Sequence, residues 1–285
     1  MNATSRREEI RELLSLSPEE VVARSEGRLV VLPSLEDLHR HFADAIIETI
    51  AALKDMQEEV RLILPFGPTG QYPYFVERVN RERLSLKHCL FFFMDEYARE
   101  GGTEVEPNHP LSFRGPVARI FSGIDEDLRP SMDRVVFPGK DNLSSLAETM
   151  AENGGIDACF GGVGIHGHLA FNEPEEGVSE SGPRVVALND FTVTINAIRD
   201  EIGGDLENFP RKALTIGMKQ ILGAKKIRIY CRNDIPGIDW ANTVLRLAVL
   251  GTPGDDYPVT HIQNHPDWQV TTDENTLASP KHILP

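Results

Sequence analysis

The sequence predicts an α/β protein with a Rossmann-like, mostly parallel sheet covered by helices on both faces. Short apolar runs typical of buried strands recur along the chain, and helical patterns lie between most of them, which is the alternation that parallel sheets show. These runs occupy residues 28–32, 60–64, 89–94, 134–137, 157–160 and 227–231. A chain of 285 residues can bury a full core as one large domain. None of its apolar runs approaches the roughly 20 residues that span a bilayer.

Helices are expected where apolar residues recur at helical spacing. The longest such segment covers residues 35–54, with Ser34 as its N-cap. Residues 144–153 and 240–250 show the same pattern. Residues 174–184 are rich in Glu, Ser, Gly and Pro, so they are expected to form an exposed loop or a mobile lid of the same domain.

Residues 1–27 form an extension ahead of the domain that residues 28–285 are expected to build. The extension holds a short amphipathic helix at residues 6–14 and a second helix start at Ser17. We expect it to pack on the domain or on a neighbouring subunit, and disorder is the alternative. The first residues lack the apolar core of a signal peptide, which favours a cytoplasmic location.

Charge and cysteine content restrict the classes of partner. The net charge of -15 argues against nonspecific binding to nucleic acid or to an anionic membrane, and an anionic substrate would need local positive groups. Cys89, Cys159 and Cys231 fall within or beside apolar runs and are odd in number. We therefore expect reduced thiols that serve packing, as in a cytoplasmic protein.

The most informative stretch follows the apolar run 157–160. There a glycine-rich loop presents His166, His168 and Glu173, and the carboxyl end of a strand is where open α/β sheets place their ligands. His168 can move protons near neutral pH, and Glu173 is close enough in sequence to orient it. Gly164 is expected to let the backbone approach a substrate closely. A tight turn with exposed histidines is the alternative.

Two other interpretations of this loop are weaker. His166 and His168, with Glu173, could act as metal ligands, but no third histidine or cysteine lies nearby in sequence. Residues 162–167 match the dinucleotide-binding fingerprint, yet that pattern requires a helix to begin at once. Residues 172–177 contain a proline and a glycine that would interrupt such a helix.

Five segments in the right order resemble the glucosamine/galactosamine-6-phosphate isomerase (glucosamine-6-phosphate deaminase) family. They are Pro68-Thr-Gly70 after an apolar run, Phe93-Met-Asp-Glu-Tyr97, Gly161-Gly-Val-Gly164 with Gly167-His-Leu-Ala-Phe-Asn-Glu-Pro174, Ala213-Leu-Thr-Ile-Gly217, and residues 265–276. The resemblance covers residues 28 to 277. It implies a sugar-phosphate aldose–ketose isomerase or deaminase that works through an enediol, with no redox cofactor and often as a homo-oligomer.

The resemblance also implies roles for single residues. Asp95 would carry the proton between C2 and C1, and its place after an apolar strand predicts a raised pKa; an N-cap or turn aspartate is the alternative. His168, held by Glu173, would open the sugar ring. Glu96 would tune Asp95 or bind the amino group, with a structural salt bridge as the alternative. His166 stands where the family has an aspartate, and its loss of negative charge should lower the pKa of His168.

The phosphate-binding residues are expected in two places. Thr69, Gly70 and Gln71 follow a strand and could offer a hydroxyl and backbone N–H groups to an anion at a helix N-terminus. Arg199 lies close to the family's phosphate-binding arginine, and a lone surface arginine is the alternative. The family's phosphate-binding lysine is absent after the run 227–231, where Arg232 could supply the charge instead.

These observations predict an enzyme that acts on a hexose 6-phosphate other than glucosamine 6-phosphate. The expected partner is a small-molecule sugar phosphate, with neither nucleic acid nor membrane. A 6-phosphogluconolactonase-like hydrolase is the nearest enzymatic alternative. The other alternative is a sensor that kept the pocket and lost catalysis, which the replacement at His166 favours and the retention of Asp95 and His168 opposes.

Overall fold

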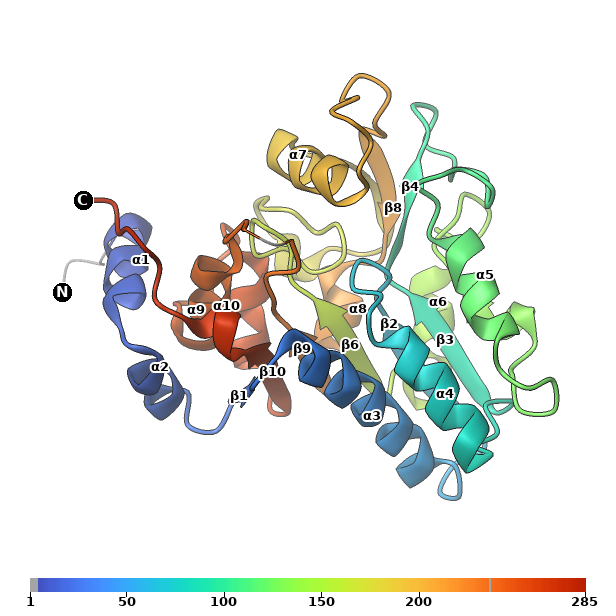
Figure 1. The fold of residues 1–285 in the computed structure, drawn as a ribbon. Coiled ribbons are helices and arrows are strands. Elements are labelled where there is room, and N and C mark those ends of the chain that lie inside the picture. The colour runs from blue at the N-terminus through green and yellow to red at the C-terminus, as the bar shows by residue number, and fades with distance from the viewer. Residues whose placement is uncertain (1–4, 236) are drawn as a thin grey trace.

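The computed structural model of the protein describes residues 5–235 and 237–285, apart from the side chain of residue 153 (Figure 1). Within this part of the chain, seven strands form one sheet in the order β1-β10-β9-β6-β2-β3-β5, and every neighbouring pair is parallel. The strands are β1 (Leu29–Leu32), β2 (Val60–Leu64), β3 (Cys89–Phe93), β5 (Val135–Val136), β6 (Ala158–Gly162), β9 (Ile227–Tyr230) and β10 (Trp268–Asp273). The predicted Rossmann-like parallel sheet is confirmed.

Six of the seven strands coincide with apolar runs that predicted them. All five residues of β2 are buried, because helices cover both faces of the sheet at this strand. The exception is β10, whose sequence Trp-Gln-Val-Thr-Thr-Asp mixes polar and apolar residues and did not predict a strand. It lies between β1 and β9 in the sheet.

Helices pack on both faces of the large sheet and make two separate cores. Leu62 and Leu64 point into the core that α3 (Leu35–Leu53), α4 (Tyr72–Glu82) and α5 (Arg114–Ser122) share. Ile63 points to the opposite core, as the alternation along a strand requires. That second core is covered by α6 (Leu146–Ala151), α8 (Met218–Leu222), α9 (Ala241–Leu250) and α10 (Glu274–Leu277). Short 3-10 turns occupy Met132–Arg134, Glu152–Gly154, Val178–Glu180 and Pro258–Asn264.

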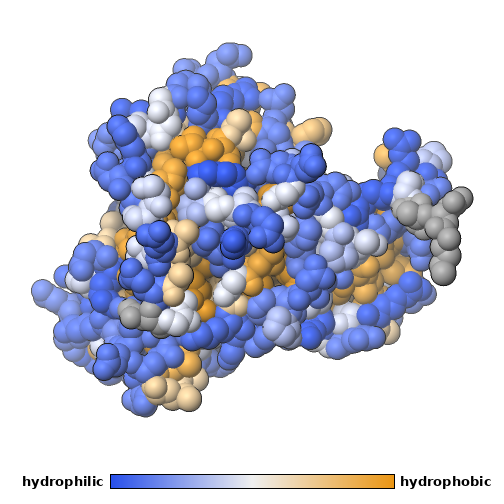
Figure 2. Space-filling view, turned by 180° about the vertical axis from the view of Figure 1, so that it is seen from behind, coloured by the Kyte–Doolittle hydropathy of each residue, from blue (hydrophilic) through white to orange (hydrophobic). Residues whose placement is uncertain are grey.

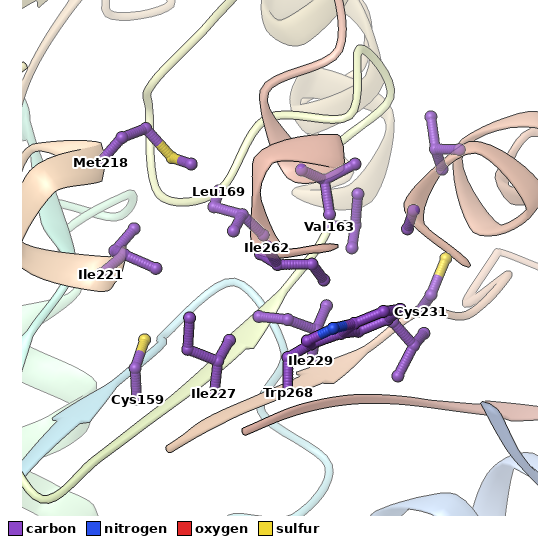
Figure 3. Packing of buried hydrophobic residues seen from close by; sticks show 14 of the residues in the cluster. Cys159, Val163, Leu169, Met218, Ile221, Ile227, Ile229, Cys231, Ile262 and Trp268 are labelled. Carbon is purple, nitrogen blue, oxygen red and sulfur yellow. The ribbon is translucent and has the colours of Figure 1, made fainter. Parts of the chain in front are cut away.

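Figure 3 shows part of this second core. Cys159, Ile227 and Ile229 rise from the sheet toward side chains of α8 and of the loops above it. The three cysteines are buried and free, and burial raises the pKa of the Cys231 thiol to about 12. They pack as small apolar side chains, as predicted.

A small antiparallel sheet lies above the large one in Figure 1. It consists of β4 (Asp95–Ala98), β8 (Lys212–Thr215) and β7 (Arg184–Ala187), and α7 (Asp190–Arg199) packs beside it. Tyr97, Phe171 and Phe209 belong to its own apolar core. These strands did not stand out in the sequence because they are short and carry charged residues. Since β4 begins directly after β3, Asp95 lies at the junction of the two sheets.

The N-terminal extension packs on its own domain beside α9 (Figure 1). It forms α1 (Arg6–Ser15) and α2 (Pro18–Arg24), and each helix begins with a serine capping box. Leu13 and Val21 are buried in the second core. Arg6 binds Asp256 with Nε 2.7 Å from Oδ2, which ties the extension to the loop after α9.

The segment 174–184 is not a lid over the cavity described below. Val178 is fully buried in the second core, and the backbone N–H of Gly177 donates to Asp255 at 2.8 Å. None of these eleven positions borders the cavity. The surface seen in Figure 2 is mostly hydrophilic, with hydrophobic residues showing in separate areas. Among the described residues, no helix combines the length and the apolar character needed to cross a membrane.

Candidate active site

A cavity of about 530 Å³ opens at the carboxyl ends of the parallel strands. The loops after β2, β3, β6 and β9 contribute to it, together with the start of α3 and the end of α7. This is where open α/β sheets bind ligands, because the loops of neighbouring strands meet there. The side chains that bear on its chemistry are His39, Thr69, Asp95, His168, Asn196, Arg199, Arg232 and Asp234.

Asp95 is held at the cavity with only 7 % of its surface exposed. Burial removes most of the water that would stabilise the carboxylate, and the nearby Glu96 adds like-charge repulsion. Together they raise the pKa of Asp95 to about 8, in agreement with the rise that its sequence position predicted. A carboxyl group with this pKa can exchange a proton near neutral pH.

Glu96 is fully buried and does not border the cavity, so its placement gives no support to a contact with the amino group of a substrate. Its other predicted role, tuning Asp95, agrees with the like-charge repulsion between the two carboxyl groups. Its carboxylate accepts hydrogen bonds from the backbone N–H groups of Tyr97, Phe113 and Arg114 and from the hydroxyl of Ser112, at 2.9–3.0 Å. Burial raises the pKa of Glu96, and these hydrogen bonds oppose that rise. Glu96 therefore fixes the start of α5 against β4.

His168 lies in the cavity wall, directly against Gly164. A Cβ at Gly164 would overlap the imidazole ring, so only glycine leaves room for the histidine there. Burial lowers the pKa of His168 to about 3, and the neighbouring His166 and Arg199 add to this effect. The ring is therefore neutral at physiological pH. Its Nδ1 is buried and has no hydrogen-bond partner among the described residues.

Glu173 and His166 lie outside the cavity lining, and the predicted hydrogen bond from His168 to Glu173 is not formed. The Glu173 carboxylate accepts from the backbone N–H of Asn189 at 2.8 Å. The Nδ1 of His166 is 3.0 Å from the Asn189 amide nitrogen, and its ring packs 4.6 Å from that of Phe191. Burial raises the pKa of Glu173 and lowers that of His166. Both residues thus border α7.

The loop after β2 reaches the cavity with Thr69 and Gly70 but not with Gln71. Gln71 is fully buried, and its side-chain amide donates to the carbonyl of Pro68 at 2.8 Å. The Gln71 side chain thus closes the loop from inside and does not reach the cavity, while a contact of its backbone N–H with an anion stays a prediction. Gly70 lies against the ring of His39, with no room for a Cβ between them.

Arg199 and Arg232 supply positive charge to the cavity. Arg199 ends α7 and lies between the side-chain oxygen of Asn196, at 3.2 Å, and the ring of Trp240, at 5.2 Å from the ring centroid. Arg232 follows β9 and is 7 % exposed. Both contact Asp234. The sequence pointed to the two arginines, but nothing in it marked Asp234, Asn196 or His39 as neighbours of this site.

The other interpretations of the loop after β6 find no support in its geometry. No group of three or more potential metal-ligating side chains occurs in the part of the chain that the structure describes. After β6 the chain turns at Gly164 and Gly167 and then forms a bridge between Leu169 and Asn172. A dinucleotide fingerprint needs a helix at this point.

Known proteins resemble the chain over most of its length. Glucosamine-6-phosphate deaminase of Rhodopirellula baltica is 30% identical over 252 residues, which covers 86% of this chain and 92% of the relative. The enzyme of the same name from Porphyromonas gingivalis strain W83 is 29% identical over 255 residues, covering 87% and 91%. No family model matches the chain.

Solved structures agree on the fold. A monomeric glucosamine-6-phosphate deaminase superposes with a TM-score of 0.74 at 22% identity, covering 87% of this chain and 98% of that one. A 6-phosphogluconolactonase from Trypanosoma brucei superposes with a TM-score of 0.59 at 16% identity, covering 87% and 96%. This chain thus shares the fold of its single α/β domain with both the deaminase and the 6-phosphogluconolactonase structures.

Proposed function

Because the chain belongs to the glucosamine-6-phosphate deaminase family, we propose that it isomerises and deaminates an amino sugar phosphate in the cavity at the carboxyl ends of the strands. One observation carries the proposal. The same cavity brings together a buried carboxyl group, a neutral histidine and two arginines, contributed by Asp95, His168, Arg199 and Arg232. An acid–base pair beside an anion-binding end is what this reaction requires.

The proposed reaction begins with ring opening at His168. The neutral imidazole takes the proton of the anomeric hydroxyl and returns one to the ring oxygen, which releases the open-chain aldehyde. Asp95, as a carboxylate, then removes the proton from C2 while the aldehyde oxygen takes a proton from the substrate ammonium group, which gives the enediol-type (enolamine) intermediate. Asp95 returns the C2 proton to C1, which leaves an imine at C2. Water adds to this imine and ammonia departs, so that the products are a ketose phosphate and ammonia.

The pKa of Asp95 suits this role when an amino sugar is bound. In the free protein a pKa of about 8 leaves most of the group protonated at pH 7. A substrate ammonium group beside Asp95 would favour the carboxylate, because an opposite charge nearby lowers the pKa of an acid. Binding of the amino substrate would thereby generate the base.

The anionic group of the substrate is proposed to bind beside the two arginines that border the cavity. Arg199 and Arg232 offer charged donors there, and Arg232 takes the place of the lysine that the family has after this strand. Thr69 and Gly70 add a hydroxyl and the N-terminus of α4, where backbone N–H groups attract anions. These replacements favour a hexose 6-phosphate other than glucosamine 6-phosphate, such as the galactosamine epimer.

The test is a coupled assay of ammonia and ketose across amino and neutral hexose 6-phosphates, with 6-phosphogluconolactone included. We expect ammonia and ketose in equal amounts from one amino sugar, and Asp95→Asn should lower the rate by at least ~10²-fold while substrate binding survives. Lactone hydrolysis alone would favour the lactonase alternative. Binding without turnover of any compound would favour a sensor. Assembly into a homo-oligomer and a cytoplasmic location stay predictions.

A further inference from the structure

Two arginines of the cavity converge on one carboxylate of the same chain. The Nε and Nη2 of Arg199 lie 3.3 Å from Oδ1 of Asp234, and its Nε is 3.2 Å from Oδ2. The Nη2 of Arg232 donates to the same Oδ2 at 2.9 Å. All three side chains border the cavity, and Asp234 is 17% exposed. A carboxylate bound between two arginines occupies the kind of position that an anionic ligand group would take.

The arrangement of this loop does not depend on Asp234. The neighbouring Asn233 anchors it, because its side-chain oxygen accepts from the backbone N–H groups of Trp240 and Ala241. The backbone N–H of Asn233 also donates to Thr276 at 2.8 Å. Within the described residues, the carboxylate of Asp234 has no hydrogen-bond partner besides the two arginines. Its side chain can therefore release them without loss of the loop conformation.

Arg199 is also held by groups other than Asp234, whereas the Arg232 guanidinium donates only to Asp234 among the described residues. Arg199 bonds to Asn196 and stacks on Trp240, as described above. Arg232 lies against Gly162 within a buried environment, and its Nε has no hydrogen-bond partner among the described residues. That buried donor remains open for another acceptor. Removal of Asp234 should thus leave Arg199 in place through Asn196 and Trp240, while the burial of Arg232 confines its guanidinium, and both would then have free donors.

We propose that Asp234 is a specificity-determining residue that competes with the anionic group of the substrate for Arg199 and Arg232. In the free protein it lowers the charge of the two arginines from +2 to +1, and a phosphate has to displace it to reach both. Asp234 therefore weakens the binding of a phosphate dianion relative to a substrate end with less negative charge. This inference rests on the proposed anion-binding end of the cavity.

The experiment measures the binding of inorganic phosphate by calorimetry to the full chain and to Asp234→Asn. Asparagine keeps the shape of the side chain and removes its charge, so we expect phosphate to bind about 10-fold tighter or more, with the KM for the sugar phosphate falling in parallel. Glu201→Gln is the matched control, because Glu201 borders the same cavity without an arginine contact. It should shift the affinity by less than about threefold. Asp234→Ala serves as a second variant if the asparagine protein does not fold.

Unchanged or weaker phosphate binding in the Asp234 variants would overturn the inference and show that the carboxylate only positions the arginines. Absence of phosphate binding in both proteins, alongside ammonia release, would also overturn it while leaving the proposed reaction standing. Tighter phosphate binding without turnover of any substrate would support the inference and contradict the proposed reaction. Arg199→Ala with Arg232→Ala should abolish the difference between the wild type and Asp234→Asn.

Discussion

Asp95→Asn should stabilise the protein at neutral and alkaline pH while it abolishes the proposed activity. The reason is the pKa of Asp95, which burial raises from the ordinary 3.8 to about 8. Between these two values the unfolded chain has released a proton that the folded protein retains. Stability therefore falls as the pH rises through this window, because the unfolded state binds fewer protons. An asparagine does not ionise, so the variant avoids this loss.

The size of this loss of stability follows from the pKa shift of Asp95. Each pKa unit is worth about 1.36 kcal/mol, so a shift of about four units corresponds to an upper limit on the order of 5 kcal/mol at pH 8. The term is small near pH 4 and vanishes only below the ordinary pKa of 3.8, where both states hold the proton. Relaxation of the protein and entry of water would reduce the measured value. A gain of roughly 2 kcal/mol or more between pH 4.5 and 8 is the expected result.

The assay is urea unfolding of the wild type and of Asp95→Asn at several pH values in this window. Asp55→Asn is the control, because Asp55 is exposed and the same change of side chain there should alter the free energy of unfolding only slightly. A difference between Asp95→Asn and the wild type that stays constant from pH 4.5 to 8 would refute the reasoning. It would mean that Asp95 ionises in the folded protein as readily as in water.

Two further substitutions test the placement of the site. Gly164→Ala should displace the ring of His168 and lower kcat/KM by ~10²-fold, with about 1–3 kcal/mol lost from the free energy of unfolding. Gly182→Ala is its control, because a Cβ at Gly182 meets open space. Equal activity of the two variants would contradict the packing of His168 against Gly164. Glu96→Gln should cost about 2 kcal/mol or more in urea unfolding, because an amide nitrogen cannot accept from the N–H donors at the start of α5. An unchanged free energy of unfolding would contradict the structural role of Glu96.

The large sheet could be predicted from the sequence because its strands are buried on both faces. Such strands consist mostly of apolar residues, and β2 shows this in its sequence Val-Arg-Leu-Ile-Leu, where Arg61 is the one polar position and is buried as well. The small sheet could not be found in the same way, since the burial of β7 alternates along the strand and β4 begins with two acids. The pairing of β4 with β8 joins segments more than 110 residues apart, and β7 pairs with β8 across a shorter stretch that contains α7. Local pattern carries no signal for such contacts.

Site residues could be predicted from the sequence where a residue with suitable chemistry follows a buried strand and borders the cavity. Asp95 and His168 were found in this way, and both border the cavity. Glu96 and Gln71 lie outside the cavity lining because adjacency in sequence is not adjacency in space. Along β4 successive side chains point to opposite sides, so the neighbour of Asp95 faces the protein interior. Asp234 was missed because its partner Arg199 lies on another element 35 residues earlier.

Burial raises the pKa of Asp95 and lowers the pKa of His168, the two groups proposed for catalysis, and the resulting protonation states affect which substrates can react. With a pKa of about 8, Asp95 holds its proton at pH 7, and with a pKa of about 3, His168 lacks one. In the free protein Asp95 and His168 are therefore both uncharged. The cluster of Arg199, Arg232 and Asp234 carries a net charge of about +1, and Asp200 and Glu201 border the same cavity. An amino sugar phosphate brings a cation to Asp95 and an anion to the arginines. A neutral hexose phosphate brings only the anion, so we expect it to bind without converting Asp95 into the base.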